Sequence, residues 1–110
     1  MKRSLILFVI AVTGCGSRQI YDWGSYESSV QHLYSEKPTA EAARDRDQLI
    51  KEVRKTLDSK KQVPPGKYAQ IGYLSYLCGD SASARQYFEQ EKTAYPESAR
   101  FMDSLIARLR

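Results

Sequence analysis

The sequence predicts an all-α fold of about five helices. Apolar residues recur at steps of three and four along most of the chain, which is the spacing of helices with one buried face. No stretch alternates apolar and polar residues in the way that a half-buried strand does. Proline and glycine residues separate the helical stretches from one another, as expected of short connections between packed helices.

The first 14 residues have the plan of a secretory signal peptide. A positively charged start (MKR) is followed by the apolar run LILFVIAV at 5–12 and then by small residues. The run is too short to cross a bilayer, because a spanning helix needs about 20 apolar residues. We therefore expect residues 1–14 to be removed and residues 15–22 to tether a helical domain at 23–110.

The residues that close this run, Val12-Thr13-Gly14-Cys15, resemble the lipobox of bacterial lipoproteins. The resemblance implies cleavage between Gly14 and Cys15 and a diacylglyceryl group on the Cys15 thiol. Several acyl chains on one residue are enough for stable membrane attachment. Gly16 follows in place of the aspartate that tends to hold such proteins in the inner membrane, so the resemblance implies the periplasmic face of the outer membrane.

Charge gives little reason to expect a nucleic-acid partner. The formal net charge of +4 includes Lys2 and Arg3, so the mature chain carries only +2. A weakly basic domain in the periplasm lacks the basic surface that nucleic-acid binding requires. The length of the mature chain is that of one domain.

Two helices are expected before the Pro-Pro pair at 64–65. The first covers 23–34, and a break at Pro38 allows Thr39 to cap the second, which runs from about 40 to 59. The charged remainder of the second helix is interpreted as a solvated face, with an interaction surface as the alternative. The residues predicted to form its buried stripe are Ala43, Ile50, Val53 and Leu57.

Residues 71–96 read as two further helices separated by a turn at Gly79-Asp80. Gly79 suits the left-handed end of a helix, and Asp80 or Ser81 can cap the next one. Gly72 lowers helix propensity by ~1 kcal/mol, so we expect it to permit a close approach of another helix. Pro96 ends the second helix and starts a third.

This stretch resembles a tetratricopeptide repeat, a helix–turn–helix unit of about 34 residues, over positions 65–98. Ser75 and Glu91 depart from the repeat, which usually has a tyrosine and an alanine there. The resemblance implies tetratricopeptide-like helical hairpins and a C-terminal capping helix at 97–109, with Phe101, Met102, Leu105 and Leu109 facing inward. Gly79-Asp80 matches the turn of the repeat. The residues that we expect to pack the repeat are Ile71, Gly72, Gly79, Ala84, Phe88 and Pro96.

The mature sequence is also similar to a family of small proteobacterial lipoproteins of unknown function. The similarity lies in the lipobox, in YDWGSYE at 21–27 and in PPGKYAQIGYLSYLCGD at 64–80. Members of that family tend to be encoded beside a lipoprotein resembling the curli secretion channel. The resemblance implies a role in an outer-membrane complex, without a known activity.

The residues predict no enzyme, cofactor, metal or small-molecule substrate. His32 is the single histidine, and no second histidine, cysteine or acidic cluster stands at ligand spacing from it in the sequence. No glycine-rich phosphate loop is present either. With Cys15 acylated, Cys78 has no partner in its own chain; we expect it to be buried, with a disulfide to another chain as the alternative.

Three residues are predicted to contact a partner. Tyr73, Tyr76 and Leu77 lie on the helical face opposite Ile71-Gly72, and the matching positions of tetratricopeptide repeats line a groove that takes peptides or helices. Aromatic residues are enriched at such interfaces, although here the N-terminal helices could cover them as core. The predicted function is therefore an adaptor that docks another envelope lipoprotein; the alternative is a structural subunit without a groove.

Overall fold

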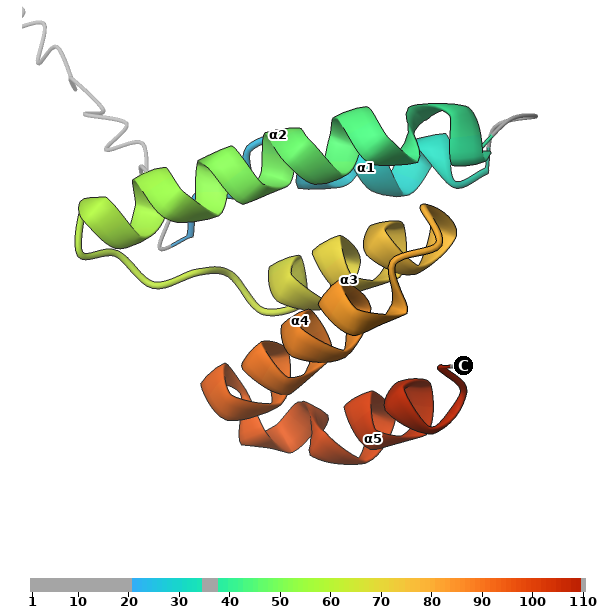
Figure 1. The fold of residues 1–110 in the computed structure, drawn as a ribbon. Coiled ribbons are helices and arrows are strands. Elements are labelled where there is room, and N and C mark those ends of the chain that lie inside the picture. Colours follow the sequence, from blue (N-terminus) through green and yellow to red (C-terminus); the bar gives the residue numbers. More distant parts are fainter. Residues whose placement is uncertain (1–20, 35–37, 110) are drawn as a thin grey trace, which may run out of the picture.

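The computed structural model describes residues 21–34 and 38–109. The signal peptide, Gly14 and Cys15 lie outside these residues. The described residues contain helices and no strand, which confirms the all-α fold (Figure 1). The helices are α1 (Tyr26–His32), α2 (Pro38–Asp58), α3 (Lys67–Leu77), α4 (Ser81–Ala94), the 3₁₀ turn η1 (Pro96–Ser98) and α5 (Ala99–Ala107).

The helices form a stack that follows their order in the chain (Figure 1). The long helix α2 packs against α1 and α3, which also contact each other; α4 packs against α3, and α5 packs against α4. Because each helix contacts mainly its neighbours in sequence, the outer side of α5 has no partner within the described part of the chain. No helix there is long and apolar enough to span a membrane.

Two clusters of buried side chains hold this stack together. The first joins α2 and α3 through Ala42, Leu49, Val53, Ile71 and Leu74, and includes Val63 of the connection between them. The second joins α4 and α5 through Ala84, Phe88 and Met102.

The buried face of α2 differs from the predicted stripe. Ala43 is exposed and Leu57 is 53% exposed, whereas Ala42 and Leu49 are fully buried. Val53 is buried as predicted and Ile50 packs partly buried against the core, but the centre of the buried face lies further around the helix, toward Ala42 and Leu49. The buried face also includes two buried polar residues, Asp45 and Thr56, so hydrophobicity alone did not reveal it.

The α3–α4 turn forms as predicted from its residues. Gly79 has φ of +80°, and Asp80 caps α4 by accepting hydrogen bonds from the Ser83 backbone N–H (3.0 Å) and hydroxyl (2.7 Å). A Cβ at Gly72 would lie 2.7 Å from the Phe88 ring and 3.2 Å from the Ala84 carbonyl oxygen. The predicted close approach of the two helices at Gly72 is therefore confirmed.

Three further details of the predicted helices are wrong. Cys78 is exposed, because α3 ends at Leu77 and the cysteine belongs to the surface turn. Phe101 is 63% exposed, because α5 packs on α4 with one side only, the side that buries Met102. Helix α1 begins at Tyr26 instead of residue 23, because Gly24 has φ of +52° and interrupts the helical conformation.

Candidate functional site

An apolar groove lies between α3 and α5. Two adjoining hollows of about 210 and 430 Å³ form it, and Tyr73 and Leu105 line both. We call the combined surface the α3–α5 groove. Its lining residues are Tyr73 and Tyr76 of α3, Phe88 and Glu91 of α4, Phe101, Met102 and Leu105 of α5, and Tyr26, Gly66, Ala69, Gln70, Ser98, Arg108 and Leu109.

Two tyrosines of α3 form one wall of this groove. Tyr73 is 40% exposed and Tyr76 is 46% exposed, and their rings stack with centroids 6.4 Å apart. The N-terminal helices therefore leave both rings open. Leu77, the third predicted contact residue, packs instead against the α2–α3 core cluster, on another side of the helix.

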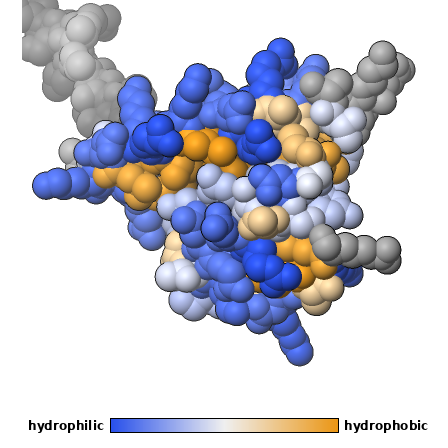
Figure 2. Space-filling view, viewed as in Figure 1, coloured by the Kyte–Doolittle hydropathy of each residue, from blue (hydrophilic) through white to orange (hydrophobic). Residues whose placement is uncertain are grey.

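The C-terminal part of α5 forms the opposite wall. Leu105 and Leu109 are partly buried against the α4–α5 cluster and also line the groove, while Phe101 projects into solvent. Figure 2 shows a hydrophobic area on the molecular surface over the C-terminal part of α5. Exposed apolar surface of this kind, rimmed by polar residues, commonly marks an interaction site.

Glu91 places a carboxylate at the apolar groove. The residue is 2% exposed; its Oε1 accepts a hydrogen bond from the Gly66 backbone N–H at 2.6 Å, and its Oε2 is buried with no donor among the described residues. Burial raises the pKa of Glu91, and the backbone N–H groups of Gly66, Ala69 and Tyr68 offset that rise only in part. Glu91 thus caps the start of α3 and keeps one acceptor oxygen unused.

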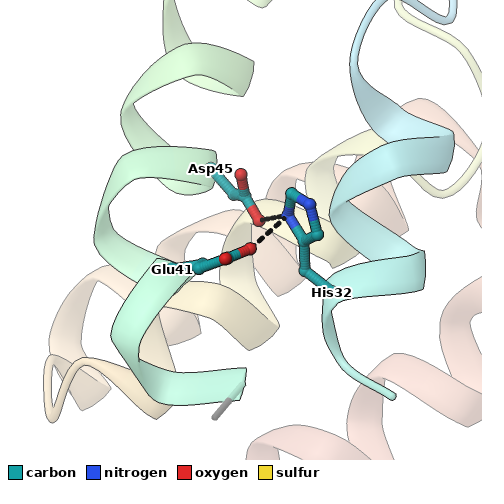
Figure 3. A group of neighbouring side chains, drawn as sticks. All are labelled: His32, Glu41 and Asp45. Carbon is teal, nitrogen blue, oxygen red and sulfur yellow. Dashed lines mark hydrogen bonds and ion pairs between the residues drawn. The ribbon is translucent and has the colours of Figure 1, made fainter. Parts of the chain in front are cut away.

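A group of three polar side chains joins α1 to α2. His32 Nδ1 lies 2.6 Å from Asp45 Oδ2 and 3.0 Å from Glu41 Oε2 (Figure 3). The sequence analysis missed this group, because His32 comes from a different helix than the two acids. The available signal was the four-residue spacing of Glu41 and Asp45, which places both on one face of α2.

A buried ion pair connects α2, α3 and the start of the described chain. Lys67 Nζ is fully buried, 3.0 Å from Glu52 Oε2, and donates to the Asp22 carbonyl oxygen at 3.3 Å. Burial alone would raise the pKa of Glu52, but hydrogen bonds from Lys67, Gln48 and Ser25 lower it below its usual value. This pair lies outside the α3–α5 groove and has a structural role.

The fold and the groove define a small all-helical protein with an open apolar surface between two of its helices. Residues 20–105 match the family described as a domain of unknown function (DUF4810), and the chain belongs to this family. No curated protein and no solved structure matches the chain.

Proposed function

We propose that the protein is a lipid-anchored adaptor of the bacterial outer membrane that docks a segment of another envelope protein in the α3–α5 groove. The observation that carries the proposal is the stacked pair of exposed tyrosines, Tyr73 and Tyr76, at the wall of this groove. Tyrosine buries a large area at a low cost in side-chain entropy and keeps a hydroxyl for hydrogen bonding, so it is frequent among the residues that dominate binding energy.

The groove favours an occupant that is mostly apolar and carries a hydrogen-bond donor. Leu105, Met102 and Phe101 offer apolar contact, and the unused Oε2 of Glu91 is an acceptor in a place where water has little access. A backbone N–H or a basic side chain of the partner would satisfy this oxygen. Leaving such a group without a donor costs about 1–3 kcal/mol, which gives the groove a means of selecting its ligand.

We propose further that α3, α4 and α5 form a tetratricopeptide-like unit with its capping helix. The contact of Gly72 with Phe88 and Ala84 and the left-handed Gly79 support this proposal, since both fall at the matching positions. In such repeats the first helix of each pair lines the inner surface that takes peptides or helices. Residues of α3 and α5 line the groove, which supports this arrangement.

We also propose that Cys15 anchors the protein to the outer membrane and that the partner resembles the curli secretion channel. The complete signal peptide and the lipobox support the anchor, and the resemblance to small proteobacterial lipoproteins supports the partner. Cys15→Ala should give an unprocessed or soluble protein. A variant that keeps its mature mass and stays in the outer-membrane fraction would show that the anchor is elsewhere.

The docking proposal is tested with the Tyr73→Ala/Tyr76→Ala double variant. Because both rings are exposed, its melting temperature should stay close to that of the wild type. Its association with the channel-like lipoprotein should weaken at least about thirtyfold, as expected for the loss of about 2 kcal/mol at a central contact. The measurement is co-purification from detergent-solubilised envelopes, together with a binding titration of the two purified proteins.

Tyr34→Ala is the matched control, because Tyr34 is 88% exposed and does not line the groove. It should leave both association and melting unchanged. Undiminished association of the double variant would contradict the docking proposal, and a collapsed fold would show that the two tyrosines are structural.

The alternative function is a structural subunit that is packed permanently within an envelope assembly. The apolar surface that includes Phe101, which is 63% exposed, favours it, because permanent interfaces are more hydrophobic than transient ones. The solution size of the protein without its lipid distinguishes the adaptor from the structural subunit. A monomer supports the adaptor, and an obligate oligomer supports the subunit.

A further inference from the structure

We propose that His32, Glu41 and Asp45 bind a divalent transition-metal ion, with Zn²⁺ as the ion that fits their chemistry. His32 is the last residue of α1, and Glu41 and Asp45 lie one turn apart on α2 (Figure 3). One ligand atom from each residue lies within 4.8 Å of the other two. The site is separate from the α3–α5 groove, and none of its residues lines that groove.

The positions of the ligand atoms are close to those of a metal site. Zn²⁺ binds imidazole nitrogen and carboxylate oxygen at about 2.0–2.2 Å, so a tetrahedral site holds its ligand atoms roughly 3.3 Å apart. The distances from His32 Nδ1 are 2.6 Å to Asp45 Oδ2 and 3.0 Å to Glu41 Oε2. Each has to open by less than about 1 Å, which small rotations of the carboxylate side chains can provide.

Charge at the site favours a cation. Two carboxylates converge on one ring nitrogen, and that nitrogen can donate only one hydrogen. The hydrogen bond goes to Asp45, whose residue is 8% exposed, and leaves Glu41 Oε2 buried without a hydrogen-bond donor in the described chain. Among the described residues, the Arg44 guanidinium lies 3.6 Å from this oxygen. A metal ion between the three residues would contact both carboxylates at once.

The ligand set selects the class of metal. Mg²⁺ and Ca²⁺ prefer sites made of oxygen atoms alone, whereas imidazole together with carboxylate suits Zn²⁺ and its neighbours in the first transition row. Three protein ligands leave one position for water. The bound ion would hold α1 against α2, and α1 also carries Tyr26, which lines the larger hollow of the groove.

The proposal is tested by calorimetric titration of the purified full chain with ZnCl₂, in detergent and with Cys78 replaced by serine. The Cys78→Ser background removes an exposed thiol that could bind zinc itself. We expect one Zn²⁺ per chain and no binding of Mg²⁺. His32→Gln and Asp45→Asn should each weaken zinc binding by more than about tenfold, because loss of a ligand costs at least as much as loss of an outer-shell partner.

Asp47→Asn is the matched control, because Asp47 lies on the same helix, is 63% exposed and pairs with Arg46. It should bind zinc as the parent does. Should Asp45→Asn fail to fold, Glu41→Gln tests the same site at a more exposed carboxylate. Its zinc affinity should also fall by more than about tenfold.

A nuclear magnetic resonance titration gives a second readout, because His32 is the only histidine in the chain. Zinc should shift the imidazole nitrogen signals at constant pH, with the larger change at Nδ1. The absence of zinc binding, or equal binding by the parent and the His32→Gln and Glu41→Gln variants, overturns the proposal. The three residues would then form an ion-pair clamp between α1 and α2.

Discussion

At the scale of single residues, Glu91 has two tasks that no local pattern reveals. Its carboxylate caps the start of α3 by accepting a hydrogen bond from the Gly66 N–H. Its other oxygen is buried without a donor among the described residues, and Glu91 is one of the residues that line the larger hollow of the groove. A substitution at Glu91 therefore changes both the packing of α3 on α4 and the polarity of the groove.

The raised pKa of Glu91 predicts a pH-dependent stability difference. Between the unfolded value, near 4.5, and the higher folded value, the folded protein binds more protons at this residue, so its contribution to stability falls as pH rises. Glu91→Gln removes this titration. The unfolding free energy of Glu91→Gln minus that of the wild type should therefore increase with pH from about 4.5 upward.

Urea denaturation of both proteins across this pH range measures the difference. The buried amide of Glu91→Gln is expected to change the unfolding free energy by a constant amount at every pH. This constant does not affect how the difference between the two proteins changes with pH. Glu89→Gln is the control, because Glu89 lies on the same helix and is exposed. A difference for Glu91→Gln that stays flat with pH would show that burial does not raise the pKa of Glu91 in the folded protein.

At the scale of elements, the contact between α3 and α4 depends on small residues. Gly72 has no room for a Cβ, and Ala84 is fully buried against the second core cluster. Tight packing of this kind transmits any increase in volume to the neighbouring helix. The turn at Gly79 and the cap at Asp80 then fix the direction in which α4 returns along α3.

Ala84→Leu is predicted to destabilise this helix pair. Three added carbon atoms have no space between α3 and α4, so we expect a loss of about 1–3 kcal/mol in the free energy of unfolding. Ala82→Leu is the matched control, because Ala82 is exposed on the same helix. Equal melting temperatures for the Ala84→Leu variant and the wild type would contradict the close approach of the two helices.

At the scale of the whole molecule, one buried ion pair joins three parts of the chain. Lys67 opens α3, Glu52 belongs to α2, and the pair also holds the segment before α1 through the Asp22 carbonyl and the Ser25 N–H. Lys67 is fully buried and Glu52 is 18% exposed, so the lysine charge depends on Glu52 for neutralisation. The pair therefore couples the stability of the N-terminal segment to that of the α2–α3 core.

Lys67→Met should lower the free energy of unfolding by about 3–5 kcal/mol, because it leaves Glu52 without its buried cation. Lys67→Met/Glu52→Gln should cost less than the sum of the two single changes, since neither charge then remains. Chemical denaturation of the four proteins gives the coupling free energy. Additive losses would show that the pair does not act as a unit. Lys92→Met, which breaks an exposed pair with Asp103, should leave stability unchanged.

The sequence by itself determined the features that depend on neighbouring residues. Helical periodicity, the left-handed Gly79, the cap at Asp80 and the start of η1 at Pro96 all arise within a few positions of the chain, and each is present in the structure. The α3 wall of the groove was also predictable, because Tyr73 and Tyr76 lie one turn apart on a single helix and face the same way.

Only the tertiary structure decided which face of each helix is buried and which distant side chains meet. The choice of Leu49 over Leu57 on α2, and of Met102 over Phe101 on α5, depends on where the neighbouring helix lies. His32 meets Glu41 and Asp45 because α1 packs along α2, and Glu91 reaches the start of α3 because α4 packs on it. The physical reason is that periodicity describes one helix in isolation, whereas burial is a property of the contact between two.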